Sequence, residues 1–134
     1  MENEILNKNV FSFFLSNHSE ERSELMLGGW DETKYNQDIS WHHVVDKKFW
    51  SLKLDDILVD GKSLGYCSRE KNCMITPDSG ASQVSFPPQA FTRMSVQHGK
   101  EVECEPGWEF NQGDLTFVIN GQHYHIESHH WNRR

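Results

Sequence analysis

No stretch of the sequence stays apolar for the roughly 20 residues that a membrane-spanning helix requires, so no membrane span is expected. Positive charge is also scarce, because 13 Lys and Arg stand against 20 Asp and Glu. The resulting net charge of −7 argues against nucleic acid and against an anionic membrane surface as partners. Hydrophobic residues make up 36% of the 134 residues, which predicts a modest core or one completed by another chain.

Residues 1–6 are acidic and lack the apolar core of a signal peptide, so the chain as written carries no export address and its compartment is left open. There are three cysteines. Cys67 and Cys73 are close enough in sequence to close a small disulfide loop, which leaves Cys104 over. Two free thiols are the alternative, because the spacing alone does not decide between them.

Short apolar runs separated by glycine and polar turns predict a mainly β protein with short helices. Asp60-Gly61 and Asn120-Gly121 each lie between two apolar runs, which is a strong signal for a β-hairpin. Within residues 50–54 the apolar side chains alternate with polar ones, so Trp50, Leu52 and Leu54 are expected to share one face. Strands are expected in residues 10–15, 24–29, 39–45, 50–54, 57–59, 64–66, 115–119 and 122–126, helical turns in 4–9, and a helix that starts on prolines in 86–94.

Five segments of the chain occur in an order known from one enzyme family. They are VFSFFLS, LMLGGWDETKYNQDISWHHV, KFWSLKLDDILVDGKSLGYC, DSGAS and LTFVINGQHYHI. Together they resemble part of the C-terminal lobe of the pepsin-type aspartic proteases, most strongly over residues 10–126. The resemblance implies that residues 1–134 form one incomplete C-terminal lobe of a pepsin-like acid-protease β-barrel with short helices.

The segment DSGAS resembles the catalytic loop of that family, which implies that Asp78 is a catalytic acid. The apolar run before Asp78 is then an inner strand that delivers the carboxylate to the lobe interface. Gly80 lets the backbone turn so that its N–H faces a carboxylate, and Ser79 stands where the family grips the opposite lobe. In such enzymes each lobe gives one aspartate, and the two carboxylates share a proton. The resemblance implies no cofactor.

The D-S-G motif occurs once in the 134 residues, and no D-T-G motif accompanies it. The family's first lobe has no counterpart here, nor has the apolar-apolar-Gly segment that follows the last hairpin in the family. One carboxylate cannot form the catalytic pair, so the lone chain is expected to be inactive. An incomplete lobe exposes strand edges and apolar core, so we expect a protein partner to cover it.

Two hypotheses follow for the function. In the first, the chain is a degenerate lobe that acts as a non-catalytic structural or docking subunit of a larger assembly. In the second, it is one piece of an active aspartic endopeptidase, completed by a second chain or a longer precursor, and it meets a peptide substrate only when a second aspartate-bearing lobe is supplied. A partner with a D-T-G or D-S-G motif and the missing segment would favour the enzyme.

Other candidate sites are weaker. His123 and His125 share a face of an expected strand, and His129 and His130 follow it, so two histidines with a carboxylate were considered as zinc ligands. A polar strand face and a solvated tail are the simpler interpretation, and no metal site is expected. Core or interface packing is likewise preferred to a sugar-binding platform for the five tryptophans, because Trp41 and Trp50 fall in expected strands.

Overall fold

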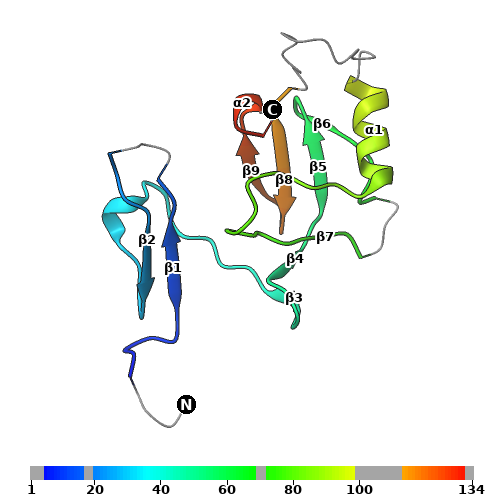
Figure 1. The fold of residues 1–134 in the computed structure, drawn as a ribbon. Helices are drawn as coiled ribbons and strands as arrows, with labels where there is room; N and C mark the ends of the chain where they lie inside the picture. The colour runs from blue at the N-terminus through cyan, green and yellow to red at the C-terminus, as the bar shows by residue number, and fades with distance from the viewer. Residues whose placement is uncertain (1–4, 17–19, 69–71, 99–112, 132–134) are drawn as a thin grey trace. The chain divides into compact units, whose positions relative to one another are not determined.

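The structure, a computed structural model, describes residues 5–16, 20–68, 72–98 and 113–131. The chain divides into two compact units, residues 1–41 and 42–134, and each is described by itself. Both are built mainly from antiparallel strands, which confirms the expected mainly β class (Figure 1). Within the described residues no helix is both long and apolar enough to cross a membrane.

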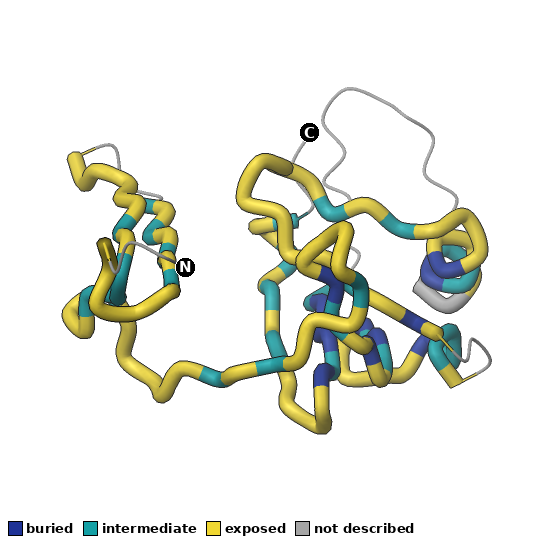
Figure 2. Tube along the Cα trace, turned by 90° about the horizontal axis from the view of Figure 1, so that it is seen from below, coloured by how far each residue is buried: buried dark blue, intermediate teal, exposed yellow. Residues whose placement is uncertain are grey.

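The first unit is a β-hairpin followed by one turn of 3₁₀ helix. Strand β1 (Phe11–Phe14) pairs with β2 (Glu24–Leu27), and the turn is η1 (Glu32–Lys34). Asp31 caps this turn, because Thr33 donates both its backbone N–H (2.8 Å) and its hydroxyl (2.7 Å) to the Asp31 carboxylate. The same bonds lower the pKa of Asp31. Among the described residues of this unit none is fully buried (Figure 2).

The second unit holds the core, and its main sheet has the strand order β6-β5-β8-β9. Both hairpin predictions are confirmed. Asp60 and Asn120 adopt positive φ, as do the glycines after them, which is the geometry that a two-residue turn of this type requires. The strands of this sheet are β5 (Asp56–Val59), β6 (Lys62–Ser63), β8 (Leu115–Ile119) and β9 (Gln122–Ile126).

A smaller sheet of order β3-β4-β7 and two helices complete the unit. On the first helix, Met94 is buried in the core and Arg93 donates to the carbonyls of Leu64 and Gly65. The core consists of Leu54, Ile57, Val59, Leu64, Cys73, Met94, Leu115, Phe117 and Ile119. The remaining elements are β3 (Val44–Asp46), β4 (Ser51–Lys53), β7 (Met74–Ile75), α1 (Pro88–His98) and α2 (Ser128–Trp131).

Three expectations about local structure are wrong. Residues 5–9 form bends, because so short a segment cannot nucleate a helix by itself. Residues 39–43 are irregular, and there the His42 ring binds the side chains of Tyr124 and Asn120 instead of joining a sheet. Residues 64–66 are not a strand, since Gly65 adopts positive φ (59°) directly after the short strand β6.

The prediction that Trp50, Leu52 and Leu54 share one face is also only partly correct. Leu54 is buried, but Trp50 is exposed and Ser51 is buried in its place. The Ser51 and Thr76 hydroxyls lie 2.8 Å apart, so a hydrogen bond satisfies the buried serine. Trp41 also lies outside any strand and is exposed, although its ring contacts that of Trp30 edge to face.

The disulfide between Cys67 and Cys73 is confirmed, and Cys73 is part of the core. The bond closes a loop across a sequence separation of 6. By loss of chain entropy in the unfolded state, closing so short a loop stabilises by about 2 kcal/mol. Replacing both cysteines by serine is therefore expected to lower the free energy of unfolding by about that amount in urea titrations. Cys104→Ser is the control, and equal stability of all three proteins would contradict the expectation.

Candidate functional site

Asp78 lies on an exposed loop directly after the strand β7. Its Oδ1 accepts a hydrogen bond of 2.8 Å from the backbone N–H of Gly80, and its carbonyl accepts one of 3.2 Å from Ala81. A Cβ added at Gly80 would come within 3.2 Å of the same Oδ1, which is a tight contact. Glycine therefore allows the backbone to approach the carboxylate, and the loop holds that carboxylate in one orientation.

The loop is attached to the smaller sheet. In that sheet β7 pairs with β4, where Leu52 faces Ile75. Thr76, two residues before Asp78, shares a hydrogen bond with the Ser51 hydroxyl, and this bond connects the end of β7 to β4. The Leu54 N–H also donates to the Cys73 carbonyl at 2.9 Å. The position of Asp78 thus depends on the sheet rather than on the loop alone.

Of the three residues that the resemblance singled out, Asp78 and Gly80 are in direct contact. Ser79 is exposed in the turn between them. Pro77, which precedes the carboxylate, lacks a backbone N–H, so it cannot donate to a neighbouring strand. The regular part of β7 accordingly ends at Ile75. The expected inner strand is therefore short, with two residues, and Met74 in it is 51% exposed.

A groove of about 780 Å³ opens beside this loop. Asp78 and Pro77 lie on one wall, while the core residues Leu54, Ile57 and Phe117 form part of its lining. Buried aromatic and aliphatic residues of the core thus form part of the groove lining. Phe86, which follows the loop, stacks on Phe117 with ring centroids 6.5 Å apart, so the groove wall and the Asp78 loop are connected through this pair.

Trp131 lines the far part of the groove and packs against the core. Its indole Nε1 is buried, and no described residue accepts a hydrogen bond from it. A buried N–H without an acceptor is unfavourable by about 1–3 kcal/mol. The groove therefore has a mixed lining, and Trp131, which contributes to it, holds a buried donor without an acceptor among the described residues.

This arrangement offers one carboxylate with acid–base capacity at the edge of a groove. An acid–base pair for peptide hydrolysis needs a second carboxylate at short range. The motif that would supply it does not recur in the sequence. The described loop therefore offers a single carboxylate of this kind, that of Asp78.

The strand order, the hairpins and the Asp78 loop together define a partial lobe of the pepsin type. The profile described as "eukaryotic aspartyl protease" matches residues 1–133. The chain belongs to the eukaryotic aspartyl protease family.

Individual relatives agree with this assignment. Gastricsin from Cavia porcellus is 33% identical over 124 residues, which cover 87% of this chain and 31% of the relative. Pepsin-2B from Gadus morhua is 32% identical, with 87% and 36% covered, and an aspartic proteinase from Oryza sativa subsp. japonica is 34% identical, with 88% and 25% covered. The chain thus spans about a third of the length of the curated relatives that it matches.

Two features were missed in the sequence. The groove combines residues from distant parts of the chain, and no local pattern indicates it. The other is a cluster of Glu127, His129 and His130, whose ligand atoms lie within 4.8 Å of one another. The histidines were weighed as zinc ligands in the sequence, but Glu127 was not singled out with them, and a polar strand face with a solvated tail was the preferred interpretation.

Proposed function

We propose that this chain forms one aspartate-bearing part of an aspartic endopeptidase. Asp78 is one of the two catalytic acids, and Ser79 and Gly80 form its supporting loop. The observation that carries the proposal is the Asp78 carboxylate, held by the Gly80 N–H at the edge of an open groove. A complementary polypeptide, either the remainder of a longer protein or a second chain, supplies the second aspartate.

The chemistry requires both aspartates. Two carboxylates at short range cannot both be ionised, so they share one proton. The ionised carboxylate takes a proton from a water that attacks the peptide carbonyl carbon, and the protonated one donates to the carbonyl oxygen. The tetrahedral intermediate then collapses. The carboxyl that took the water proton gives it to the peptide nitrogen, the C–N bond breaks to release the amine, and the other carboxylate takes back a proton from a hydroxyl of the intermediate, so the pair again holds one proton. A chain with Asp78 alone has either the base or the acid, not both.

The groove supports the need for a complement. Core side chains line it, and the buried Trp131 Nε1 lacks an acceptor among the described residues. An extended apolar segment would cover these side chains. The same segment would press on the loop that bears Asp78, so completion of the fold and completion of the site are coupled.

The proposal is tested on material purified under native conditions from its source. Hydrolysis of a peptide substrate is measured at acidic pH with and without pepstatin, and co-purifying chains are identified by mass spectrometry. Pepstatin-sensitive cleavage in a fraction that contains a second D-T-G or D-S-G motif supports the proposal. A stable complex without such a motif and without cleavage contradicts it.

A second candidate is a non-catalytic docking subunit, and a specific surface favours it. On the hairpin of the first unit, Phe11 pairs with Leu27 and Phe13 with Leu25 in register. These four side chains lie on one face of the hairpin, and each is about half exposed or more. An apolar face of this kind is typical of a surface that contacts another protein. The complex without cleavage, described above, is the outcome that this candidate predicts.

A further inference from the structure

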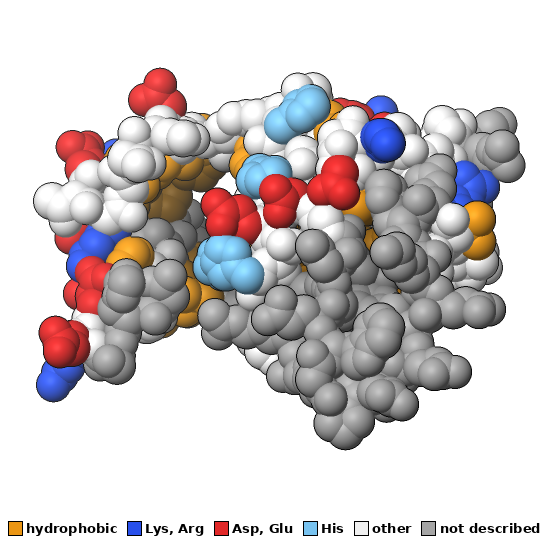
Figure 3. All heavy atoms as spheres, turned by 90° about the horizontal axis from the view of Figure 1, so that it is seen from above, with side chains coloured by type: hydrophobic (Ala, Val, Ile, Leu, Met, Phe, Trp, Pro, Cys, Tyr) orange, Lys and Arg blue, Asp and Glu red, His pale blue; other side chains and the backbone are white. Residues whose placement is uncertain are grey.

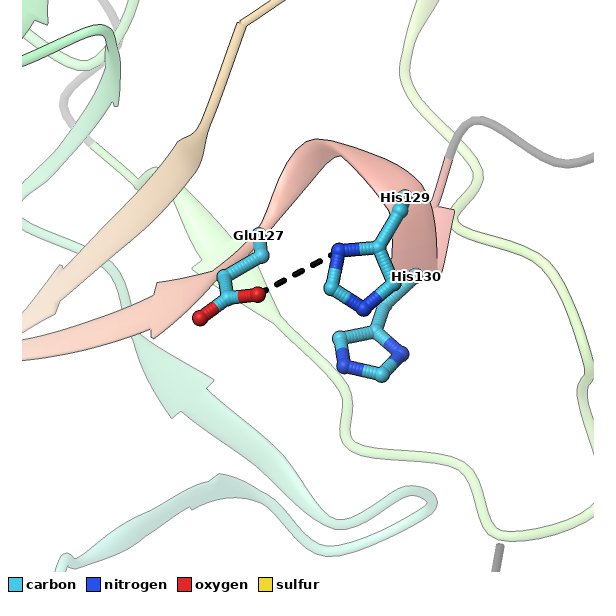
Figure 4. A group of neighbouring side chains, drawn as sticks. All are labelled: Glu127, His129 and His130. Carbon is cyan, nitrogen blue, oxygen red and sulfur yellow. Dashed lines mark ion pairs between the residues drawn. The ribbon is translucent and has the colours of Figure 1, made fainter.

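A cluster of possible metal ligands lies where the strand β9 ends and the helix α2 begins. Glu127 is the first residue after β9, and His129 and His130 belong to α2. One carboxylate oxygen and one ring nitrogen from each histidine all lie within 4.8 Å of one another. Figure 4 shows the Glu127 carboxylate facing the His129 ring, with the His130 ring beside it.

The backbone that carries these ligands is held in place from both sides. Ile126 and Trp131 flank the cluster, and both pack against the core. Between them the Ser128 N–H donates to Asp114 Oδ1 at 2.9 Å, and the His130 N–H donates to the Glu127 carbonyl at 2.9 Å. The turn is therefore formed without a metal, and an ion would have to order little more than side chains that are already adjacent.

The distances between these atoms fit a small metal ion of intermediate softness, such as zinc. With bonds of about 2.0–2.2 Å in tetrahedral coordination, two donor atoms on one zinc lie about 3.3 Å apart. The distance from Glu127 Oε2 to His129 Nδ1 is 3.2 Å. The rings of His129 and His130 have centroids 3.9 Å apart, and one His130 nitrogen lies within 4.8 Å of both of these atoms. Both side chains are exposed, so neighbouring residues do not lock their rotamers.

We infer that Glu127, His129 and His130 form a binding site for a zinc ion. Two imidazoles and one carboxylate favour zinc over the hard cations magnesium and calcium, which prefer oxygen ligands. Three protein ligands leave a fourth position for water. His130 also lines the groove beside Asp78, but the proposed peptide hydrolysis does not require a metal ion.

The surroundings are favourable for a cation. Asp114 lies close to the cluster, because its Oδ1 accepts a hydrogen bond from the Ser128 N–H. Its second carboxylate oxygen, Oδ2, is 3.5 Å from His125 Nε2. Figure 3 shows acidic and histidine side chains side by side on this face. The chain as a whole is acidic, with a net charge of −7, which raises the local concentration of cations.

The test is a titration of the full chain with Zn²⁺ at neutral pH, in competition with a chromophoric chelator. All proteins carry Cys104→Ser, because a cysteine sulfur also binds zinc. We expect one equivalent of zinc to bind. The substitutions Glu127→Gln, His129→Ala and His130→Ala should each weaken the affinity by at least about tenfold, since even the loss of a residue that only supports a ligand costs 10–100-fold. His123→Ala, an exposed histidine on β9 outside the cluster, is the control and should change nothing.

A second readout keeps the test independent of the chelator. Zinc that binds the folded chain raises its melting temperature, and the increase should disappear in the His129→Ala, His130→Ala double variant but not in the control. Excess Mg²⁺ should not replace zinc in either measurement. Undiminished binding in the double variant, or equal weakening by His123→Ala, would overturn the inference. Neither the zinc affinity nor the melting temperature depends on peptidase activity. The zinc proposal and the peptidase proposal can therefore be disproved independently of each other.

Discussion

Replacing Asp78 by asparagine is expected to lower peptide hydrolysis by the completed assembly by about 10²–10⁴-fold, the range that one general acid–base group contributes. The asparagine oxygen can still accept from the Gly80 N–H, so the loop keeps its shape. What disappears is the negative charge and the capacity to exchange a proton. The loss should therefore appear in kcat, while the affinity for peptide changes little. Initial rates over a range of substrate concentrations at acidic pH measure it.

The matched control is Asp38→Asn, which makes the same change of charge at an exposed aspartate that is not part of the Asp78 loop. This variant should keep the rate of the unmodified assembly. If Asp78→Asn retained full activity, Asp78 would not be a catalytic acid in this assembly. If both variants lost activity equally, the effect would come from net charge and not from the proposed site.

Truncation of Phe117 to alanine should lower the free energy of unfolding by about 3–5 kcal/mol, the usual cost of removing a buried phenylalanine ring. Phe117 is 7% exposed and lies in the central strand β8, between β5 and β9. Its ring stacks on Phe86, the residue that connects the Asp78 loop to the core. The loss is comparable to the whole stability of many domains, so a large fraction of the variant should be unfolded at room temperature.

Phe91→Ala on the helix α1 is the control, because Phe91 is 51% exposed and loses the same atoms. Denaturant titrations followed by circular dichroism measure both variants. A cost for Phe117→Ala no larger than that for Phe91→Ala would mean that the Phe86–Phe117 pair does not hold the groove wall. The role of this pair in placing Asp78 would then be wrong.

Local chemistry explains which parts of the fold were predictable. Asp60-Gly61 and Asn120-Gly121 specify their turns through backbone conformations that few residues accept, so both hairpins follow from two letters each. The strand β8 followed from its mostly apolar residues directly before Asn120-Gly121, and all but one of its residues are buried. The turn in which the Gly80 N–H donates to Asp78 could be anticipated because its residues are contiguous in the sequence.

The failures have a common physical cause, which is a partner distant in sequence. Ser51 is buried because the Thr76 hydroxyl satisfies it, 25 residues away. Residues 39–43 stay irregular where His42 contacts Tyr124, 82 residues away. The helix α2 appeared to be a polar tail, yet Trp131 packs against the core and fixes it. Periodicity reports on exposure to solvent, so it cannot show a polar contact that replaces solvent.

The pairing of β5 with β8 has a consequence for the kinetics of folding. The two hairpins β5–β6 and β8–β9 are local and can form early, but the register that joins them brings Asp56 opposite Val118, across 118 − 56 = 62 positions of the chain. Closing a loop of that length is slow because its entropy is lost before any contact is gained. Asp78 lies inside this loop. The strand that precedes it, however, pairs with β4 through Leu52 and Ile75, across only 75 − 52 = 23 positions. This shorter loop costs less entropy to close, so the segment that bears Asp78 can be anchored before the main sheet is complete.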